Sequence, residues 1–386
     1  MFAMLAAACG DDDDTASSDD GAASDDGSSG DDGAASDDGS SGDDGAASDD
    51  GSSGDDGAAS DDGSSGDDGA ASDDGSSGDD GATADPLKIA YIQTGSFDYY
   101  QSGVDGTELL ADELGVELIV LNSDLDAETE IANVEDALTQ DIDGLVVFSV
   151  TRASEEATLN AANDAGVPTA VLYGYAPELE DQGVVFVQAG VEDVGRIAGT
   201  WMADNIESGE VAMIQGALGR GDVEGYTAGW QEGVASNSDL EIVAEISANW
   251  SRAEAVTVME DIITANPDLV GVWVNNEDMA IGAIQAIEAA GLSDQITVVS
   301  MNGSPEGLAA VESGQIAATV GWSPAQEAQM ALVRLVDYVR NGVEPDQVLC
   351  SPPLVLITED NLDAASPWVP TAESTAAAVE AACFSS

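Results

Sequence analysis

The sequence contains no histidine and only seven Lys and Arg residues among 386, against 77 Asp and Glu. Without histidine, Ser-His-Asp and Cys-His catalytic centres and every metal site with an imidazole ligand are excluded. The net charge of −70 argues against binding to nucleic acid, because affinity for phosphate comes mostly from Lys and Arg. No run of 18 apolar residues occurs, so the sequence predicts no membrane-spanning helix.

The acidic residues are spread over two regions of different composition. Residues 1–85 contain 27 acids and no base, whereas residues 86–386 contain the other 50 acids and all seven bases, a net charge of −43. The second region has ordinary hydrophobicity, and its length of about 300 residues suffices for one large or two mid-sized cores. Because salt screens the repulsion between surface charges, such acidity indicates adaptation to saline surroundings.

The first nine residues are apolar and uncharged, and they end in the sequence Leu-Ala-Ala-Ala-Cys before Gly10. Small residues before a cleavage point are typical of a signal peptide, although the positive n-region is missing. The segment resembles a bacterial lipobox, which implies that Cys9 is lipidated. Its apolar stretch is short and Ala6 stands where Leu is commoner, and a start codon assigned too far downstream explains both. We expect residues 1–9 to be a signal peptide; an accidental apolar N-terminus is the alternative.

Residues 19–78 repeat the twelve-residue unit Asp-Asp-Gly-Ala-Ala-Ser-Asp-Asp-Gly-Ser-Ser-Gly five times. No side chain in the unit is larger than Asp, so stacked units would bury no core, and the spacing of a calcium loop is absent. Gly and Ser make such a chain flexible, and its aspartates repel one another. We expect residues 10–85 to be a disordered acidic linker that holds a folded domain away from a membrane.

From Pro86 onwards the pattern predicts alternating strands and helices. Strands are expected at 87–93, 116–121, 144–148, 168–173, 184–188, 210–215, 241–247, 271–274, 297–301 and 317–322. Helices are expected at 101–114, 128–140, 154–165, 191–206, 223–236, 252–265, 279–290, 305–313 and 324–340. Strands that are apolar on both sides indicate an α/β fold with parallel sheets covered on both faces, as a barrel or as two doubly wound lobes.

Four motifs in this region resemble the ribose-type periplasmic binding proteins of ABC importers. They lie at residues 131–136, 275–283, 298–307 and 314–320. The resemblance implies two Rossmann-like lobes of periplasmic binding protein type I, with crossovers near residues 188–190, 322–324 and 351–354. It implies an N-terminal lobe of residues 86–189 plus 323–352, and a C-terminal lobe of residues 190–322 plus 353–386.

Ligands of open α/β sheets bind beyond the carboxyl ends of the strands. The loops expected there carry aromatic rings, which can stack on the C–H faces of a sugar, and amides, which bond to hydroxyl groups. The candidate ligand-binding residues are Phe97, Tyr99, Tyr100, Tyr173, Arg220, Trp250, Asn276, Asn302 and Trp322. The resemblance places the first three on the family's first-lobe aromatic segment, Trp250 on its second-lobe stacking ring, and Asn276 on its sugar-binding Asn.

The sequence also departs from the family pattern. Tyr173 and the following Gly replace an Asp-Arg pair, Asn302 replaces an Asp, and Trp322 replaces a Gln near the hinge. An Arg of the family aligns near Glu224. These changes make the pocket less charged and more aromatic, so ribose itself is not the expected ligand. Core packing is the competing interpretation for the aromatic residues, helix capping is the competing one for the asparagines, and Arg152 is a second basic residue whose contact with ligand stays open.

Two further cysteines, Cys350 and Cys383, are expected to pair in an exported protein, which would pin residues 369–386 against the last strand. No zinc site, other metal site or cofactor is expected. The sequence thus predicts a monomeric, lipid-anchored, extracytoplasmic receptor that closes on a small solute, a sugar or polyol, and presents it to an ABC permease. The alternatives are a nucleoside-like or aromatic ligand, and a signalling receptor for such a solute. No sequence feature supports an enzyme, and the basic helix-turn-helix of a transcription regulator is absent.

Overall fold

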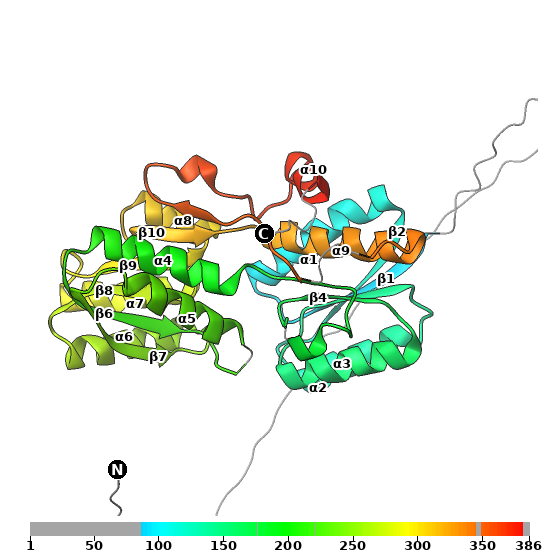
Figure 1. Cartoon of the computed structure of the whole chain (residues 1–386), viewed down its shortest axis with the longest axis horizontal. Helices are drawn as coiled ribbons and strands as arrows, with labels where there is room; N and C mark the ends of the chain where they lie inside the picture. Colours follow the sequence, from blue (N-terminus) through cyan, green and yellow to red (C-terminus); the bar gives the residue numbers. More distant parts are fainter. Residues whose placement is uncertain (1–85, 176, 220, 345–348, 381–386) are drawn as a thin grey trace, which may run out of the picture. The chain divides into compact units, whose positions relative to one another are not determined.

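The computed structural model describes residues 86–175, 177–219, 221–344 and 349–380, which form two α/β lobes (Figure 1). The segments predicted as a signal peptide and an acidic linker lie outside the described residues, as do Arg220 and Cys383. Each lobe has one six-stranded sheet with helices on both faces, so the expected α/β class and the two-lobe architecture are confirmed. Within the described ranges, no helix has the length and apolar character needed to cross a membrane.

The sheet of the first lobe has the strand order β11-β5-β4-β3-β1-β2, and all its pairs are parallel. Its strands are β1 (Leu87–Gln93), β2 (Val116–Asn122), β3 (Gly144–Val147), β4 (Thr169–Leu172), β5 (Val185–Val187) and β11 (Leu349–Cys350). Helices α1 (Asp98–Leu114) and α9 (Pro324–Asn341) pack together, and so do α2 (Ala127–Leu138) and α3 (Arg152–Ala165). The central strands are buried throughout because both sheet faces are covered.

The sheet of the second lobe has the order β12-β10-β9-β8-β6-β7, in which only the edge pair β10–β12 is antiparallel. Its strands are β6 (Gly209–Gln215), β7 (Leu240–Ser247), β8 (Leu269–Val274), β9 (Thr297–Asn302), β10 (Ala318–Gly321) and β12 (Val355–Ile357). Its helices are α4 (Val191–Asn205), α5 (Asp222–Val234), α6 (Arg252–Ala265), α7 (Glu277–Ala290) and α8 (Pro305–Glu312). Helices α4 and α5 pack together, as do α6 and α7.

Side-chain caps begin most helices where the sequence places Ser, Thr, Asp or Asn after a strand. Thr151 forms a capping box with Ser154 at α3, and Ser251, Ser304 and Ser323 accept backbone N–H bonds at α6, α8 and α9. Because each cap satisfies an N–H group that would otherwise lack a partner, it fixes the point where the strand-end loop becomes a helix. The loops that hold Trp250, Asn302 and Trp322 are therefore short.

The chain passes from the first sheet to the second after β5, returns to the first after β10, and passes to the second again after β11. The part after β12 differs from expectation. We expected residues 353–386 to belong to the second lobe, but helix α10 (Ala372–Glu380) packs against α9 and α1 of the first lobe. Buried Thr375 accepts a hydrogen bond of 2.8 Å from Gln329 of α9. The assignment fails because α10 packs on α9, and the short sequence of α10 has no hydrophobic periodicity that would predict this contact.

Candidate functional site

Both sheets reverse their strand order at an internal pair. In the first sheet β1 lies between β2 and β3, and in the second β6 lies between β7 and β8. The loops after β1 and β3, and after β6 and β8, therefore diverge to opposite faces of their sheet and leave a crevice at the carboxyl edge. Ligands of open α/β sheets occupy such crevices. The candidate residues of the first lobe, Trp250 before α6 and Asn276 at the start of α7 all follow strands at or next to these reversals of strand order.

In the first lobe, five aromatic rings gather beyond β1, β3 and β4. Phe97 precedes α1 and is 59% exposed, whereas Tyr99 and Tyr100 in its first turn are partly buried. Tyr100 meets Phe148 edge-on at 5.0 Å, and Phe148 stacks on Tyr173 at 5.3 Å with an angle of 11° between the rings. Tyr173 is 3% exposed, so most of its ring is packed and mainly its edges can face a ligand.

Tyr99 is the centre of a buried hydrogen-bond network. Its hydroxyl donates to Glu327 Oε2 at 2.6 Å, accepts from Trp322 Nε1 at 2.9 Å, and lies 3.1 Å from the hydroxyl of Tyr173. Trp322 is 1% exposed and lies just before α9, where the chain returns to the first lobe. The polar edges of three candidate residues are thus bonded to one another, and Trp322 is a packed ring.

Glu327 of α9 was not identified from the sequence. Its side chain is buried, and its Oε1 has no hydrogen-bond partner among the described residues. Burial raises the pKa of Glu327 to about 8, although the hydrogen bond from Tyr99 lowers it. The same burial, together with the neighbouring carboxylate, raises the pKa of Tyr99 well above its ordinary value. A glutamate in a helical pattern normally indicates an exposed position, so this role could not be predicted from the sequence.

Trp250 stands between β7 and α6 and covers the carboxyl end of β6. Its ring lies so close to Gly216 that a Cβ on that glycine would be 2.1 Å from Trp250 Cζ2. Asn249 and Trp250 both adopt positive φ, 52° and 61°, before Ser251 caps α6. The ring is partly buried and packs against apolar residues, so it combines an exposed part with a packing role.

The two asparagines of the second lobe occupy different environments. Asn276 caps α7, where its Oδ1 accepts from the Met279 N–H at 2.8 Å, as the capping interpretation expected. Asn302 ends β9 with φ 115° and 9% exposure, and its Oδ1 has no hydrogen-bond partner among the described residues. Buried Glu277 holds the turn that follows, because it accepts from the N–H groups of Gly303 and Ser304, both at 2.7 Å. Burial raises the pKa of Glu277 to about 7.

Trp368 is a second residue that the sequence did not reveal. Its Nε1 donates to the carbonyl oxygens of Asn302 and Trp322, both at 3.2 Å, and its ring meets Tyr99 edge-on at 5.5 Å. It therefore contacts three of the candidate ligand residues. It follows the last expected strand, 317–322, by 46 residues and lies beyond every motif shared with the family. Only its residue type indicated a largely buried position.

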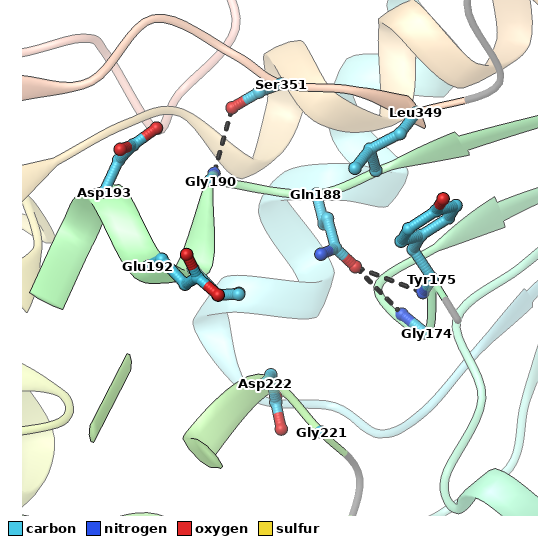
Figure 2. Close-up of a pocket in the computed structure, with 11 residues that line it drawn as sticks. Gly174, Tyr175, Gln188, Gly190, Glu192, Asp193, Gly221, Asp222, Leu349 and Ser351 are labelled. Atoms are coloured by element: carbon cyan, nitrogen blue, oxygen red, sulfur yellow. Dashed lines mark hydrogen bonds between the residues drawn. The ribbon is translucent and has the colours of Figure 1, made fainter. Parts of the chain in front are cut away.

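A cavity of about 330 Å³ lies beside the crossovers, and none of the candidate ligand residues that the structure describes lines it (Figure 2). Its wall includes the loop after β4, the first residues of α4 and α5, and the segment after β11. Gln188 Oε1 accepts from the N–H groups of Gly174 and Tyr175, and the Gly190 N–H donates to Ser351 Oγ at 3.0 Å (Figure 2). The last bond joins two of the crossovers.

Arg152 at the start of α3 bonds to two residues of its own lobe. Its Nη1 donates to the carbonyl of Gly174 at 2.6 Å and pairs with buried Glu155 at 3.0 Å. Gly174 must be glycine here, because its φ is 134° and a Cβ would meet the Glu155 carboxylate at 2.0 Å. Arg152 thus fixes the loop that follows Tyr173. Among the described residues, no group of three or more acidic or cysteine side chains is arranged to hold a metal ion.

The comparisons with known proteins agree with this geometry. A family model described as a periplasmic binding protein domain matches residues 89–342. The ribose import binding protein of Escherichia coli is 32% identical over 241 residues, which are 61% of this chain and 78% of that protein. The xylitol-binding protein of Mycolicibacterium smegmatis is 28% identical over 280 residues, 71% of this chain and 77% of that protein.

Among solved structures, a periplasmic solute binding protein of an ABC transporter from Actinobacillus succinogenes, with bound D-allose, is similar over nearly its whole length. The match has a TM-score of 0.66 and 26% identity, and it covers 72% of this chain and 99% of that one. The family model covers well over half of this chain, in the region that forms the two lobes. The chain therefore belongs to the periplasmic binding protein family.

Proposed function

We propose that this protein captures a small polar solute, a sugar or a polyol, between the carboxyl edges of its two sheets and delivers it to an ABC permease. The chemical class of the solute is proposed from the relatives, whose names specify ribose, xylitol and allose. None of these three relatives is named for a nucleoside, so that alternative gains no support. A signalling receptor would capture its solute in the same way.

The observation that carries the proposal is the pairing of aromatic faces with acceptor atoms at the strand ends. Buried Gln93 Oε1 and Asn302 Oδ1 have no hydrogen-bond partner among the described residues. A buried acceptor without a partner costs about 1–3 kcal/mol. Solute hydroxyl groups would donate to these oxygens, while Tyr100 and Trp250 offer ring surface to the C–H faces of the solute.

The proposed binding residues are the candidates named from the sequence, and we assign them different roles. Phe97, Tyr100 and Trp250 would provide ring contact, and Asn302 would provide the acceptor. We propose that Tyr99, Tyr173 and Trp322 shape the pocket from behind, because their polar atoms bond to one another or to Glu327. Asn276 would offer its amide N–H groups, since its oxygen caps α7. Arg220 stays a candidate whose position lies outside the described residues.

A thermal-shift panel tests the proposal. A solute that binds only the folded state raises stability by RT ln(1 + [L]/Kd), so a solute at 100-fold its Kd adds about 2.7 kcal/mol. We expect pentoses, hexoses, polyols or inositols to raise the melting temperature, and nucleosides to leave it unchanged. If the folded protein shows no shift with any sugar or polyol, the proposed capture is refuted. The relatives are binding proteins, and we propose that this domain likewise catalyses no reaction and needs no cofactor.

The anchoring is proposed on sequence grounds. We propose an extracytoplasmic monomer that is lipid-anchored through Cys9, with residues 10–85 as its tether. Cys350 at the end of β11 is 1% exposed and disulfide-bonded, and we propose Cys383 as its partner. Such a bond would fasten the C-terminal segment to the first lobe, to which α10 is also bound.

A further inference from the structure

After β12, the last strand among the described residues, the chain passes once more from the second lobe to the first. Leu362 packs against the core of the second lobe soon after β12. Residues 366–371 then lead to α10, which packs on α9 and α1 of the first lobe. We define residues 366–375 as the C-terminal strap.

The strap is bonded to both lobes and to the hinge between them. Ser102 of α1 donates to the carbonyl of Trp368 at 2.5 Å, and Ser323 donates to the carbonyl of Pro367 at 2.6 Å. The indole N–H of Trp368 bonds to the other lobe, because it donates to the carbonyl oxygens of Asn302 and Trp322 at the ends of β9 and β10. One residue thus joins helix α1 of the first lobe to the strand ends of the second.

The same residue reaches the candidate ligand site. Trp368 is 9% exposed, its ring meets Tyr99 edge-on, and its N–H donates to the backbone carbonyls of Asn302 and Trp322. A rotation of one lobe against the other would have to strain the Ser102–Trp368 bond or the bonds of the indole N–H, because they lead to different lobes. Hinge closure and the placement of Asn302 therefore depend on one side chain.

We propose that the C-terminal strap is a fourth connection between the lobes and that Trp368 is a positioning residue for solute binding. Its indole N–H fixes Asn302 and Trp322 relative to Tyr99, and the strap restricts the range of lobe orientations. The part that concerns solute binding rests on the proposed function. The part that concerns the hinge does not.

Single-molecule energy transfer measures the hinge directly in the full chain without solute. Fluorophores carried by unnatural amino acids at exposed Glu113 of α1 and Glu260 of α6 report the distance between lobes and leave the cysteines unchanged. Trp368→Phe keeps the ring against Tyr99 and removes the N–H donor. We expect it to broaden the distribution of distances about two-fold, since fewer bonds then restrict the lobes. The matched control Val369→Ala, at a residue 72% exposed, should leave the distribution unchanged.

A second variant guards against a folding defect. Thr375→Val removes the bond to Gln329 that docks α10 and preserves the shape of the side chain, so we expect a smaller broadening in the same direction. An unchanged distribution of inter-lobe distances in both Trp368→Phe and Thr375→Val would refute the proposal that the C-terminal strap restricts the lobe orientations. The circular dichroism spectrum confirms that each variant is folded.

Affinity tests the positioning role. For a solute that the thermal-shift panel identifies, Trp368→Phe should weaken binding about three- to tenfold, the effect of one lost hydrogen bond on the site. It should also change the ratio of affinities for two stereoisomers, which a loss of stability alone would not. Equal affinities for wild type and variant would refute the positioning role. A panel without any ligand would refute the proposed function and leave the result from energy transfer standing.

Discussion

The buried carboxyl of Glu327 predicts a fall in stability as the pH rises from 6 to 8. Its pKa in the folded state is about 8, against an ordinary value of 4.5, because burial favours the neutral form. Between these values the folded state keeps a proton that the unfolded state releases. The contribution of Glu327 to the free energy of unfolding is therefore largest below pH 4.5, and it is lost progressively as the pH rises from 4.5 through 8.

The size of the fall follows from the same values. For a single carboxyl with pKa 8, linkage gives a loss of about 2 kcal/mol between pH 6 and 8. Glu277, whose pKa burial raises to about 7, adds a loss of about 1 kcal/mol over the same range, mostly below pH 7. We therefore expect the wild-type protein to lose about 3 kcal/mol in all, and the variant Glu327→Gln only about 1.

Urea unfolding at half-unit steps of pH, followed by tryptophan fluorescence, measures these free energies. Glu327→Gln keeps an oxygen that can accept from Tyr99 and leaves no charge to bury. Between pH 7 and 8 Glu327 contributes most of the fall, so the two proteins should diverge most clearly there. Glu277→Gln is the matched control, and it should change the slope mainly below pH 7. If wild type and Glu327→Gln lose stability in parallel up to pH 8, the raised pKa is refuted.

Three other predictions concern the ring contact, the tether and the disulfide. Trp250→Ala should weaken solute binding by about 1–3 kcal/mol, whereas Trp273→Ala, in the buried strand β8, should cost about 3–5 kcal/mol of stability; calorimetry and unfolding of both variants separate pocket from core. Deletion of residues 10–85 should leave solute affinity unchanged in titration calorimetry, and a large loss would show that the linker contributes to the site. Reduction of a Cys350–Cys383 bond should cost about 2–4 kcal/mol of stability, and mass spectrometry that finds both thiols free would contradict the pairing.

The periodicity of the sequence was sufficient to predict the strands and helices from Leu87 to Arg340, and the caps placed most helix starts within three residues. This succeeded because the central strands are apolar on both sides and most helices follow a strong capping residue. The two short edge strands β11 and β12 and helix α10 were missed. Their two to nine residues carry no usable period, and only packing against the finished sheets and against α9 selects their conformation.

In the candidate site, the orientation of the side chains could not be predicted from the sequence. The sequence placed Tyr99, Tyr173 and Trp322 at strand or helix ends correctly, but position along the chain does not say which way a ring turns. The three polar groups turn inward because the buried carboxyl group of Glu327 lies among them, and a hydrogen bond in the low-dielectric interior is stronger than one in water. Their inward turn leaves the exposed ring surface to Phe97, Tyr100 and Trp250, and it leaves Asn302 as the deepest acceptor without a partner among the described residues of the candidate set. A pocket with these members would select its solute by the match of hydroxyl donors to Asn302 and of C–H faces to the rings, with the positioning of both dependent on the packed network behind them.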